Sequence, residues 1–307
     1  MSGEIKLFCG DFIPVYMSRV FALFFVLLYA VGCVNSQSQV DNRFIPMQPL
    51  PEQLKECSGL VELGDGFFLG LNDSGNTADL WVFNDNPQYP VKKIKVKGAT
   101  NEDWEELASD EEFVYIGDTG NNSGTRKELS VYKIRRSALF ESEEVSYEKI
   151  HFSFPDQKKF SPSVKHNFDC EAMVCIGDSL YVFTKNRGNG KTDAYGFPKV
   201  PGTYSAKKFG SFEAGGLVTG AAYRSVDSRG QLALIGYTVE DQGYHPFILD
   251  FSGITIPDFF KTNPVRYTYD GKLQTESILF FGPDTVLITN EEEHGDEGFI
   301  YKVILDK

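Results

Sequence analysis

Histidine and cysteine are scarce in this chain, which has four of the first and five of the second among 307 residues. No pair of them has the spacing of zinc ligands, so a zinc site is disfavoured. The sequence also lacks a Gly-x-Ser-x-Gly turn, a phosphate-cradling glycine-rich loop and a dinucleotide-binding fingerprint. Positive charge is outweighed as well. A formal net charge of −13 would repel nucleic acid, and we expect no nucleic-acid partner.

No apolar run in the N-terminal region is long enough to cross a bilayer. The run from Val20 to Val31 has twelve apolar residues, whereas a membrane-spanning helix needs roughly 20. Twelve residues suit the hydrophobic region of a signal peptide, and Arg19 provides its positive flank. We therefore expect an exported protein with a signal peptide at 1–33 and a polar tether at 34–44.

The end of this run, Ala30-Val31-Gly32-Cys33, resembles the lipobox of bacterial lipoproteins, although Ala30 stands where leucine is usual. The resemblance implies a lipid on Cys33, a place in the cell envelope on the outer membrane or the periplasmic face, and membrane contact through that lipid only. An ordinary cleaved signal, giving a secreted or soluble periplasmic protein, is the alternative. Three further cysteines cannot form an even disulfide framework and are expected to be small buried apolar side chains: Cys57, Cys170 and Cys175.

What the sequence does have is aromatic residues, glycine and internal repetition. Aromatics reach 14%, and one pattern of short β-type runs recurs five times after residue 50. A first column is always polar: Ser58, Glu105, Glu171, Thr219 and Glu276. A second column, two residues later, is always apolar: Leu60, Leu107, Met173, Ala221 and Ile278. A third column ends the next run and is again polar: Asn72, Asp118, Thr184, Tyr237 and Asn290.

A repeat of about 50 residues with three or four short strands is typical of a β-propeller with four-stranded blades. Candidate fourth strands lie between the repeats, at 91–96, 149–154, 207–212 and 264–269. The last repeat has none, so a strand near 43–50 would close the ring. We predict an all-β propeller over residues 45–307 with five blades. A sixth blade after Glu105 is the alternative, and a two-sheet sandwich is the runner-up.

The phase of the repeats predicts a shared site. The first column begins one strand and the third column ends the next, so both lie at the same end of each blade, around the central channel. Converging carboxylates must be protonated, paired or bound to a cation, and oxygen ligands suit Ca²⁺ or Mg²⁺. The candidate metal ligands are Glu105, Glu171, Glu276, Asp118, Asn72 and Asn290. For the first column, a purely structural role, bonding backbone N–H groups at the blade ends, is an equal alternative.

Other residues near these columns are candidate ligand-binding or catalytic groups. The loops at Asp73 and Asp118 share the pattern Asp-[Ser/Thr]-Gly-Asn, which is first a turn signal and second a source of ligands at the rim. Lys185 could neutralise part of the negative charge, and Arg126 is a candidate anion-binding residue. The ligand-binding candidates are Asp73, Asp103, Arg126, Lys185, Tyr237 and Glu291. Weak candidates for a general base are His166, His294 and Asp169.

The segment Asn101–Tyr132, with Asp103-Trp104-Glu105 and Gly117-Asp118-Thr119-Gly120-Asn121, resembles a family of uncharacterised bacterial secreted propeller lipoproteins. Asp169-Cys170-Glu171 with Thr184-Lys185, and Thr275-Glu276-Ser277, match later blades of that family. More distantly, the arrangement is similar to calcium-binding propellers of the gluconolactonase-like and phytase-like groups. That similarity implies a divalent cation at the channel mouth, with calcium as the expected cofactor, and a hydrolase of lactones or phosphoesters as one outcome.

Two hypotheses follow. The first is a monomeric, lipid-anchored binding module that takes a small molecule, a cell-envelope protein or a divalent cation at its acidic mouth. The second is a calcium-dependent hydrolase that uses the same site. A cation held beside an open cleft would favour the enzyme, and a plugged channel would favour the binding module.

Overall fold

The computed structural model divides the chain after Asn35, and the second unit, Ser36–Lys307, is compact. It describes residues 39–40, 43–86, 88–240, 243–292 and 297–305, all in the second unit. The expected signal peptide with Cys33 and most of the expected tether therefore lie outside the described residues, and so does His294. Within the described ranges, no helix is long and apolar enough to cross a membrane.

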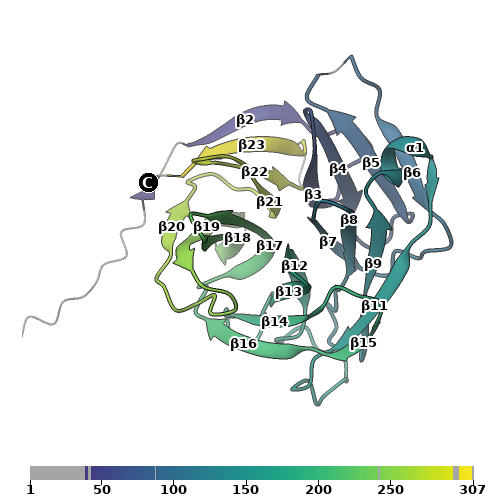
Figure 1. Cartoon of the computed structure of the whole chain (residues 1–307). Coiled ribbons are helices and arrows are strands. Elements are labelled where there is room, and N and C mark those ends of the chain that lie inside the picture. The colour runs from purple at the N-terminus through teal and green to yellow at the C-terminus, as the bar shows by residue number, and fades with distance from the viewer. Residues whose placement is uncertain (1–38, 41–42, 87, 241–242, 293–296, 306–307) are drawn as a thin grey trace, which may run out of the picture. The chain divides into compact units, whose positions relative to one another are not determined.

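The second unit is a five-bladed β-propeller (Figure 1). Each blade is an antiparallel sheet of four strands in which the chain runs outward from the channel. Blade 1 holds β3 (Cys57–Gly64), β4 (Phe67–Asn72), β5 (Asp79–Asn84) and β6 (Lys92–Val96). Blade 2 holds β7 (Trp104–Ser109), β8 (Phe113–Asp118), β9 (Leu129–Arg135) and β11 (Glu148–Ser153). Blade 3 holds β12 (Cys170–Ile176), β13 (Ser179–Thr184), β14 (Thr192–Pro198) and β16 (Lys207–Phe212).

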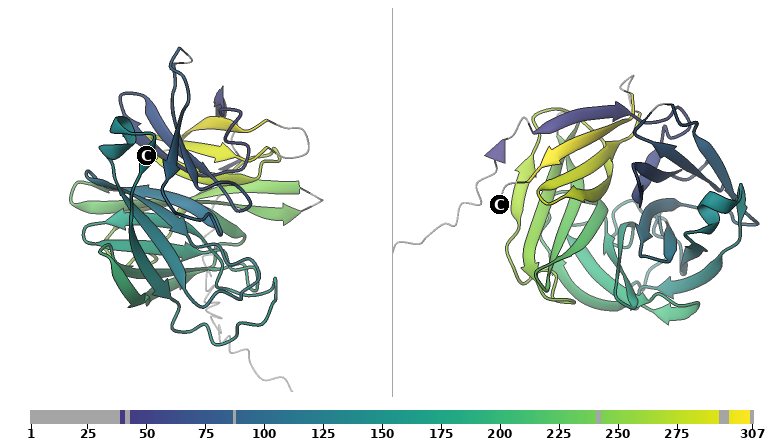
Figure 2. Two further views of the ribbon diagram at one scale, coloured as in Figure 1. Left: turned by 90° about the vertical axis from the view of Figure 1, so that its right-hand side faces the viewer. Right: turned by 45° about the horizontal axis from the view of Figure 1, so that its top comes forward.

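The last two blades follow the same order. Blade 4 holds β17 (Leu217–Val226), β18 (Arg229–Glu240), β19 (Gly243–Ile254) and β20 (Val265–Thr268). Blade 5 holds β21 (Thr275–Gly282), β22 (Thr285–Asn290) and β23 (Phe299–Ile304), and its outer strand is β2 (Phe44–Pro49). The β18–β19 hairpin is longer than the others and extends beyond the neighbouring blades (Figure 2). The prediction of five blades is confirmed.

The predicted closure of the ring by an N-terminal strand is also confirmed. β2 pairs antiparallel with β23, so a strand from the N-terminal part of the propeller completes its last blade. Pro46 and Pro49 stand on this outer strand, where they remove N–H donors from an edge that could otherwise pair with another chain.

Short strands that pair in parallel with the outermost strand extend three of the blades. β10 (Glu144–Val145) pairs with β6, and β15 (Gly202–Ser205) pairs with β11. β1 (Gln39–Val40), within the expected tether, pairs with β20. The stretch after Glu105 that could have held a sixth blade instead forms part of blade 2, the short helix α1 (Ala138–Glu141), β10 and a loop.

The core is divided among the seams between blades. Each of five clusters of buried apolar side chains draws its members from two adjacent blades, as when Trp104 of blade 2 packs with Leu69 and Leu80 of blade 1. Because each sheet buries both faces against its neighbours, no blade has a core of its own. Cys57 and Cys170 are buried in these seams as expected, whereas Cys175 is only half-buried.

A β-bulge marks the start of the innermost strand in every blade. The pairing register slips between Cys57 and Gly59 in blade 1, and the same slip recurs in the other four blades. The skipped residues are the first column of the repeat: Ser58, Glu105, Glu171, Thr219 and Glu276. A bulge leaves one residue unpaired and re-aims its side chain. The repeat therefore encodes a backbone irregularity as well as a residue type.

Candidate cation site at the acidic channel mouth

The first column separates into two groups by what its side chains do. In blades 1 and 4, the hydroxyls of Ser58 and Thr219 donate to the carbonyls of Trp104 and Thr275 on the next blade's inner strand. These contacts tie neighbouring inner strands together. Blades 2, 3 and 5 carry glutamate at the same position, and Glu105, Glu171 and Glu276 are all buried. These longer side chains supply the charge of the mouth.

The tightest group of carboxylates joins blades 2 and 3. Glu105, Asp169 and Glu171 each offer an oxygen atom, and these oxygen atoms all lie within 4.8 Å of one another. All three residues are buried, with Asp169 fully inaccessible. We call these residues the acidic triad. Asp169 was a candidate base rather than a metal ligand in the sequence analysis, and it takes the place there expected for Glu276.

The loop that follows β8 positions the triad. The backbone N–H of Asn121 donates to Asp169 Oδ1 at 2.7 Å, so a blade 2 loop holds a blade 3 carboxylate. Gly120 precedes it, and a Cβ atom at this glycine would collide with Glu105 Oε1 and the Asp103 carboxyl group. The Asp-Thr-Gly-Asn pattern thus serves as a turn and also leaves room for the carboxylates.

Two cationic side chains reach the triad from the loop after β13. Lys185 Nζ donates to Glu171 Oε2, and Arg187 pairs with Asp169 and, at 3.4 Å, with Glu171. Lys185 is almost fully buried and lies 5.2 Å from the ring centre of Tyr237. Arg187 was not expected from the sequence. Its place in the blade 3 loop, at the level where blade 2 has its Asp-Thr-Gly-Asn turn, was the available signal.

Further carboxyl groups surround the triad, so negative charge exceeds positive charge. Gln274 Nε2 donates to Glu276 at 2.9 Å and also to Glu291, which links two carboxyl groups of blade 5. Asp73 and Asp103 both raise the pKa of Glu105 by charge repulsion. The acids of the mouth are Asp73, Asp103, Glu105, Asp169, Glu171, Glu276 and Glu291. In the described part of the chain, Lys185 and Arg187 are the cations that contact the triad.

Burial and crowding shift the acid equilibria of the mouth. Burial, followed by repulsion from Glu171, raises the pKa of Glu105 well above its usual range. Burial also raises the pKa of Glu171 to about 8, against the opposing pull of Lys185. The pKa of Glu291 rises to about 9, and that of Asp73 to about 6, with burial as the largest cause in each. The mouth therefore holds protons near neutral pH that a divalent cation would displace.

Lys185 remains charged in this setting. Burial, the largest single effect, would lower its pKa, but the negative groups around it, first of all Glu171, together outweigh burial and raise the pKa well above its usual value. Its ammonium group offsets part of the negative charge of the mouth and leaves the rest uncompensated.

The third column does a different job from the first. Four of its members accept hydrogen bonds from backbone N–H groups: Asn72 from Glu56, Asp118 from Asp103, Thr184 from Asp193 and Asn290 from Phe299. The amide nitrogens of Asn72 and Asn290 donate to backbone carbonyls as well. Their polar atoms thus fasten loops to blade ends. These residues have the kind of structural role that was considered above for the first column, and they are not among the triad's oxygen donors.

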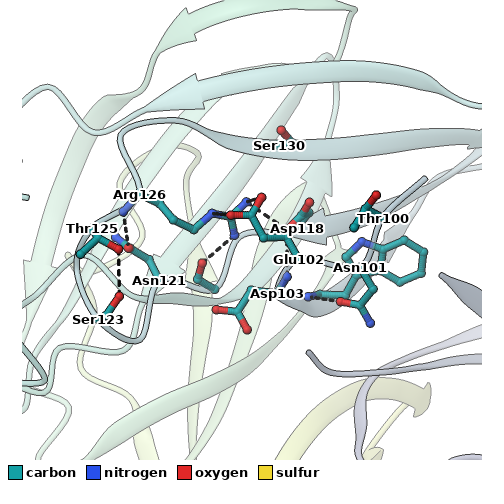
Figure 3. A network of polar contacts seen from close by, with 12 residues as sticks. Thr100, Asn101, Glu102, Asp103, Asp118, Asn121, Ser123, Thr125, Arg126 and Ser130 are labelled. Carbon is teal, nitrogen blue, oxygen red and sulfur yellow. Dashed lines mark hydrogen bonds and ion pairs between the residues drawn. The ribbon is translucent and has the colours of Figure 1, made fainter. Parts of the chain in front are cut away.

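Arg126 is engaged by carboxylates of its own blade. Its Nη2 atom lies 3.0 Å from Asp118 Oδ1 and its Nε atom 3.3 Å from Glu102, and Nη1 donates to the carbonyl of Gly120 (Figure 3). The guanidinium group therefore stabilises the loop that carries Gly120. It lies beside the triad rather than in it, and its charge is already balanced.

The described histidine candidate stands at the rim. His166 Nε2 lies 3.2 Å from the carbonyl of Asn122, and Nδ1 accepts from the N–H of Phe168. Both ring nitrogens are therefore occupied by backbone groups. Asp169 is the candidate base that the structure brings into the cluster.

A buried acid below the triad was missed by the sequence analysis. Glu106 follows the bulge of blade 2, and its carboxyl accepts from the N–H of Leu107 at 2.9 Å and from that of Ala221, on blade 4, at 3.1 Å. Gly59 and Gly220 occupy equivalent positions, and a Cβ there would meet backbone atoms of the adjacent inner strand. At this level the inner strands approach one another closely, and Glu106 spans the channel to bond to blade 4.

Comparisons with known proteins add no argument about this chain beyond the fold that its strand pairing already gives. No protein-family model matches the chain, and no curated protein matches it. Solved structures that resemble it include glutaminyl cyclase of Myxococcus xanthus, at 10% identity and a TM-score of 0.43, over 86% of this chain and 94% of that one. The catalytic domain of the GH62 α-L-arabinofuranosidase of Coprinopsis cinerea has 11% identity to this chain and a TM-score of 0.45, over 85% of this chain and 96% of that one.

The WD40 β-propeller domain of Doa1 gives 11% identity and a TM-score of 0.39, over 85% of this chain and 87% of that one. Identities this low say nothing about activity or substrate, because one fold hosts many unrelated functions. Function has to be argued from the site itself.

Proposed function

We propose that this protein binds a divalent cation at the acidic mouth of its propeller, through Glu105, Asp169 and Glu171. The observation that carries the proposal is the convergence of three buried carboxylates whose oxygen atoms lie within 4.8 Å of one another. Burying one such group without a partner is costly, and burying several together is more so. A divalent cation neutralises this repulsion and satisfies the oxygen atoms at once.

Calcium is the cation that we propose. The donor set consists of carboxylate oxygens, which suit hard cations. Calcium takes six to eight oxygen ligands in flexible geometry, and three carboxylates can supply up to six. Asp103 would be a further oxygen donor, because its carboxyl group lies next to Gly120, as Glu105 does. Lys185 and Arg187 would move aside or pair with the remaining acids.

The test is a calorimetric titration: the purified protein is first treated with chelator, which is then removed, and CaCl₂ is added while the binding heat is measured. We expect one tight site. Glu105→Gln and Asp169→Asn should each weaken binding by more than about tenfold, because each removes a charged ligand while keeping the shape of the side chain. Glu102→Gln is the matched control, since that carboxyl group is 64% exposed and contacts Arg126 rather than the triad.

Failure would take a definite form. If the unmodified protein gives no heat with Ca²⁺ or Mg²⁺, or if Glu105→Gln and Glu102→Gln behave alike, the cation site is refuted.

A calcium-dependent hydrolase is the second candidate, and one observation favours it. Glu291 and Asp73 lie beside the cluster with pKa values raised to about 9 and about 6. Carboxyl groups shifted toward neutral pH are suited to exchanging protons with a reacting group. Such an enzyme should cleave a lactone or a phosphate ester only with calcium present, and Glu291→Gln should lower the rate without lowering calcium affinity.

We further propose that the protein works outside the cytoplasm, anchored by a lipid on Cys33. The support is the apolar run with its positive flank and the Gly32-Cys33 ending. Labelling of the expressed chain with a radioactive fatty acid tests this, with Cys33→Ser as the control. Equal labelling of the two chains would refute the anchor.

A further inference from the structure

The end of the channel opposite the acidic mouth opens into a cavity of about 300 Å³. Its lining comes from the far halves of the five inner strands. The second column of the repeat forms its floor: Leu60, Leu107, Met173, Ala221 and Ile278. All five are buried. The repeat thus encodes an apolar ring at one end and an acidic ring at the other.

The rim of this cavity is wider and mixed in character. Two residues beyond the floor, each inner strand contributes one half-buried side chain: Glu62, Ser109, Cys175, Tyr223 and Phe280. Just outside the rim, two apolar side chains stay exposed, Val226 at 42% and Phe281 at 38%. The cavity therefore offers a ligand both apolar side chains, at its floor and entrance, and polar groups, so an amphiphilic molecule suits it.

Arg224 is the cationic group of this cavity, and its charge is balanced by no carboxylate at ion-pair distance among the described residues. Nη1 donates to the carbonyl of Gly282 and Nη2 to that of Pro283. Nε and Nη2 both donate to Gln231 Oε1, at 2.8 and 2.6 Å. Gln231 in turn donates to Asp250, which is the nearest acid in this chain of contacts.

These contacts leave one N–H donor of the guanidinium group without an acceptor among the bonds described above. It carries five N–H groups, and the four bonds above use both on Nη2, the one on Nε and one on Nη1. The remaining N–H of Nη1 belongs to a side chain that lies over the Phe280 ring, 4.3 Å from its centre, at the cavity rim. The acceptors already bonded are uncharged, so an incoming anion meets a guanidinium group that no direct ion pair neutralises in the described part of the chain.

We propose that this second mouth binds a small amphiphilic anion, a carboxylate on an apolar chain or ring. The apolar body lies against the ring formed by Leu60, Leu107, Met173, Ala221 and Ile278, and the carboxylate accepts a charge-assisted hydrogen bond from Arg224. A volume of about 300 Å³ is at the lower end for ligand pockets, which limits the ligand to a small molecule. This site is separate from the cation site and does not depend on it.

The test is calorimetric titration of the whole protein with decanoate, and with 1-decanol as the uncharged counterpart. Decanoate should bind more tightly than decanol, and a calcium chelator should not change either affinity. Ala221→Leu adds bulk at the floor and should weaken both ligands by more than about tenfold. Arg224→Gln should weaken decanoate by about tenfold and leave decanol unchanged.

Glu62→Gln is the control, because it removes the rim carboxylate without touching the floor or the guanidinium group. It should keep or improve decanoate binding, and thermal melts should show that each variant is folded. If Arg224→Gln does not fold, the proposal is still tested by the ratio of decanoate affinity to decanol affinity in the original protein and by the effect of Ala221→Leu on both. The proposal is overturned if decanoate gives no heat up to about 1 mM, if decanol binds equally well, or if Ala221→Leu binds like the original.

Discussion

Two glycines in equivalent loops are needed for different physical reasons. Gly75 has φ of +83° and open space around its missing side chain, so only backbone strain opposes a larger residue. Gly120 has ordinary backbone geometry, but a Cβ there would collide with the carboxyl groups of Glu105 and Asp103. The same sequence pattern therefore serves two purposes. Gly75 allows the backbone turn in blade 1, and Gly120 leaves space for the carboxyl groups of the acidic site in blade 2.

Gly120→Ala should abolish or strongly weaken cation binding, because the methyl group displaces two carboxylates of the mouth. Gly75→Ala is the matched control, which should cost about 1 kcal/mol of stability and leave cation affinity unchanged. Calorimetry and urea denaturation of both variants test this. Equal cation affinity in the two would show that Gly120 does not shape the site.

The sequence predicted which column would converge but not every member of the triad. Repeat phase placed Glu105, Glu171 and Glu276 at one end of the channel, where the structure has them. Asp169 lies just before its strand, and the N–H of Asn121 from another blade fixes its direction. No periodicity along the chain reports a contact of that kind, whereas Arg187 could have been found from its equivalent place in the blade 3 loop.

At the scale of the element, each innermost strand begins with a bulge and each second strand ends with a fastening side chain. The bulge explains why consecutive residues, such as Glu105 and Glu106, both serve the channel at different depths. Strand positions and the closing strand were predictable because they follow from hydrophobic pattern and repeat length. The bulge was not, since an extra unpaired residue leaves the pattern of residue types almost unchanged.

Asn290→Ala tests whether the third column is structural. Asn290 accepts from the N–H of Phe299 at 2.8 Å, and its removal leaves that donor without its partner. We expect a loss of about 1–3 kcal/mol in the free energy of unfolding, measured by urea denaturation, with no change in cation affinity. A loss of cation affinity at unchanged stability would instead make Asn290 a ligand.

At the scale of the whole molecule, five sheets share their cores pairwise and meet at a channel with two unlike ends. Because blade 5 is completed by β2, the ring is held shut by pairing between the two ends of the described chain. Removal of residues 1–49 should therefore lower the melting temperature and promote association through the uncovered edge of β23. Melting scans and sizing of the shortened protein check this, and an unchanged monomer would contradict it.

The stability of the cation-free protein should fall as pH rises, because carboxyl groups of the acidic mouth have raised pKa values. The native pKa values of Asp73, Glu171 and Glu291 are raised to about 6, 8 and 9, from ordinary values of 3.8 to 4.5. The native state then holds protons that the unfolded chain has released, so this contribution is complete below about pH 4 and is lost as pH rises toward 9. Without cation, melting temperature should fall over this range, and calcium should restore it at the alkaline end.

The central claim is that buried, partly protonated carboxylates form the cation site. The most direct measurement is the number of protons released per calcium ion bound, obtained by calorimetry near pH 7.5 in buffers of different ionisation enthalpy. Because burial raises the pKa of Glu105 well above its usual range and that of Glu171 to about 8, binding must expel protons, and the release should shrink in Glu105→Gln. Calcium binding with no proton release, or with the same release in Glu105→Gln, would contradict the account.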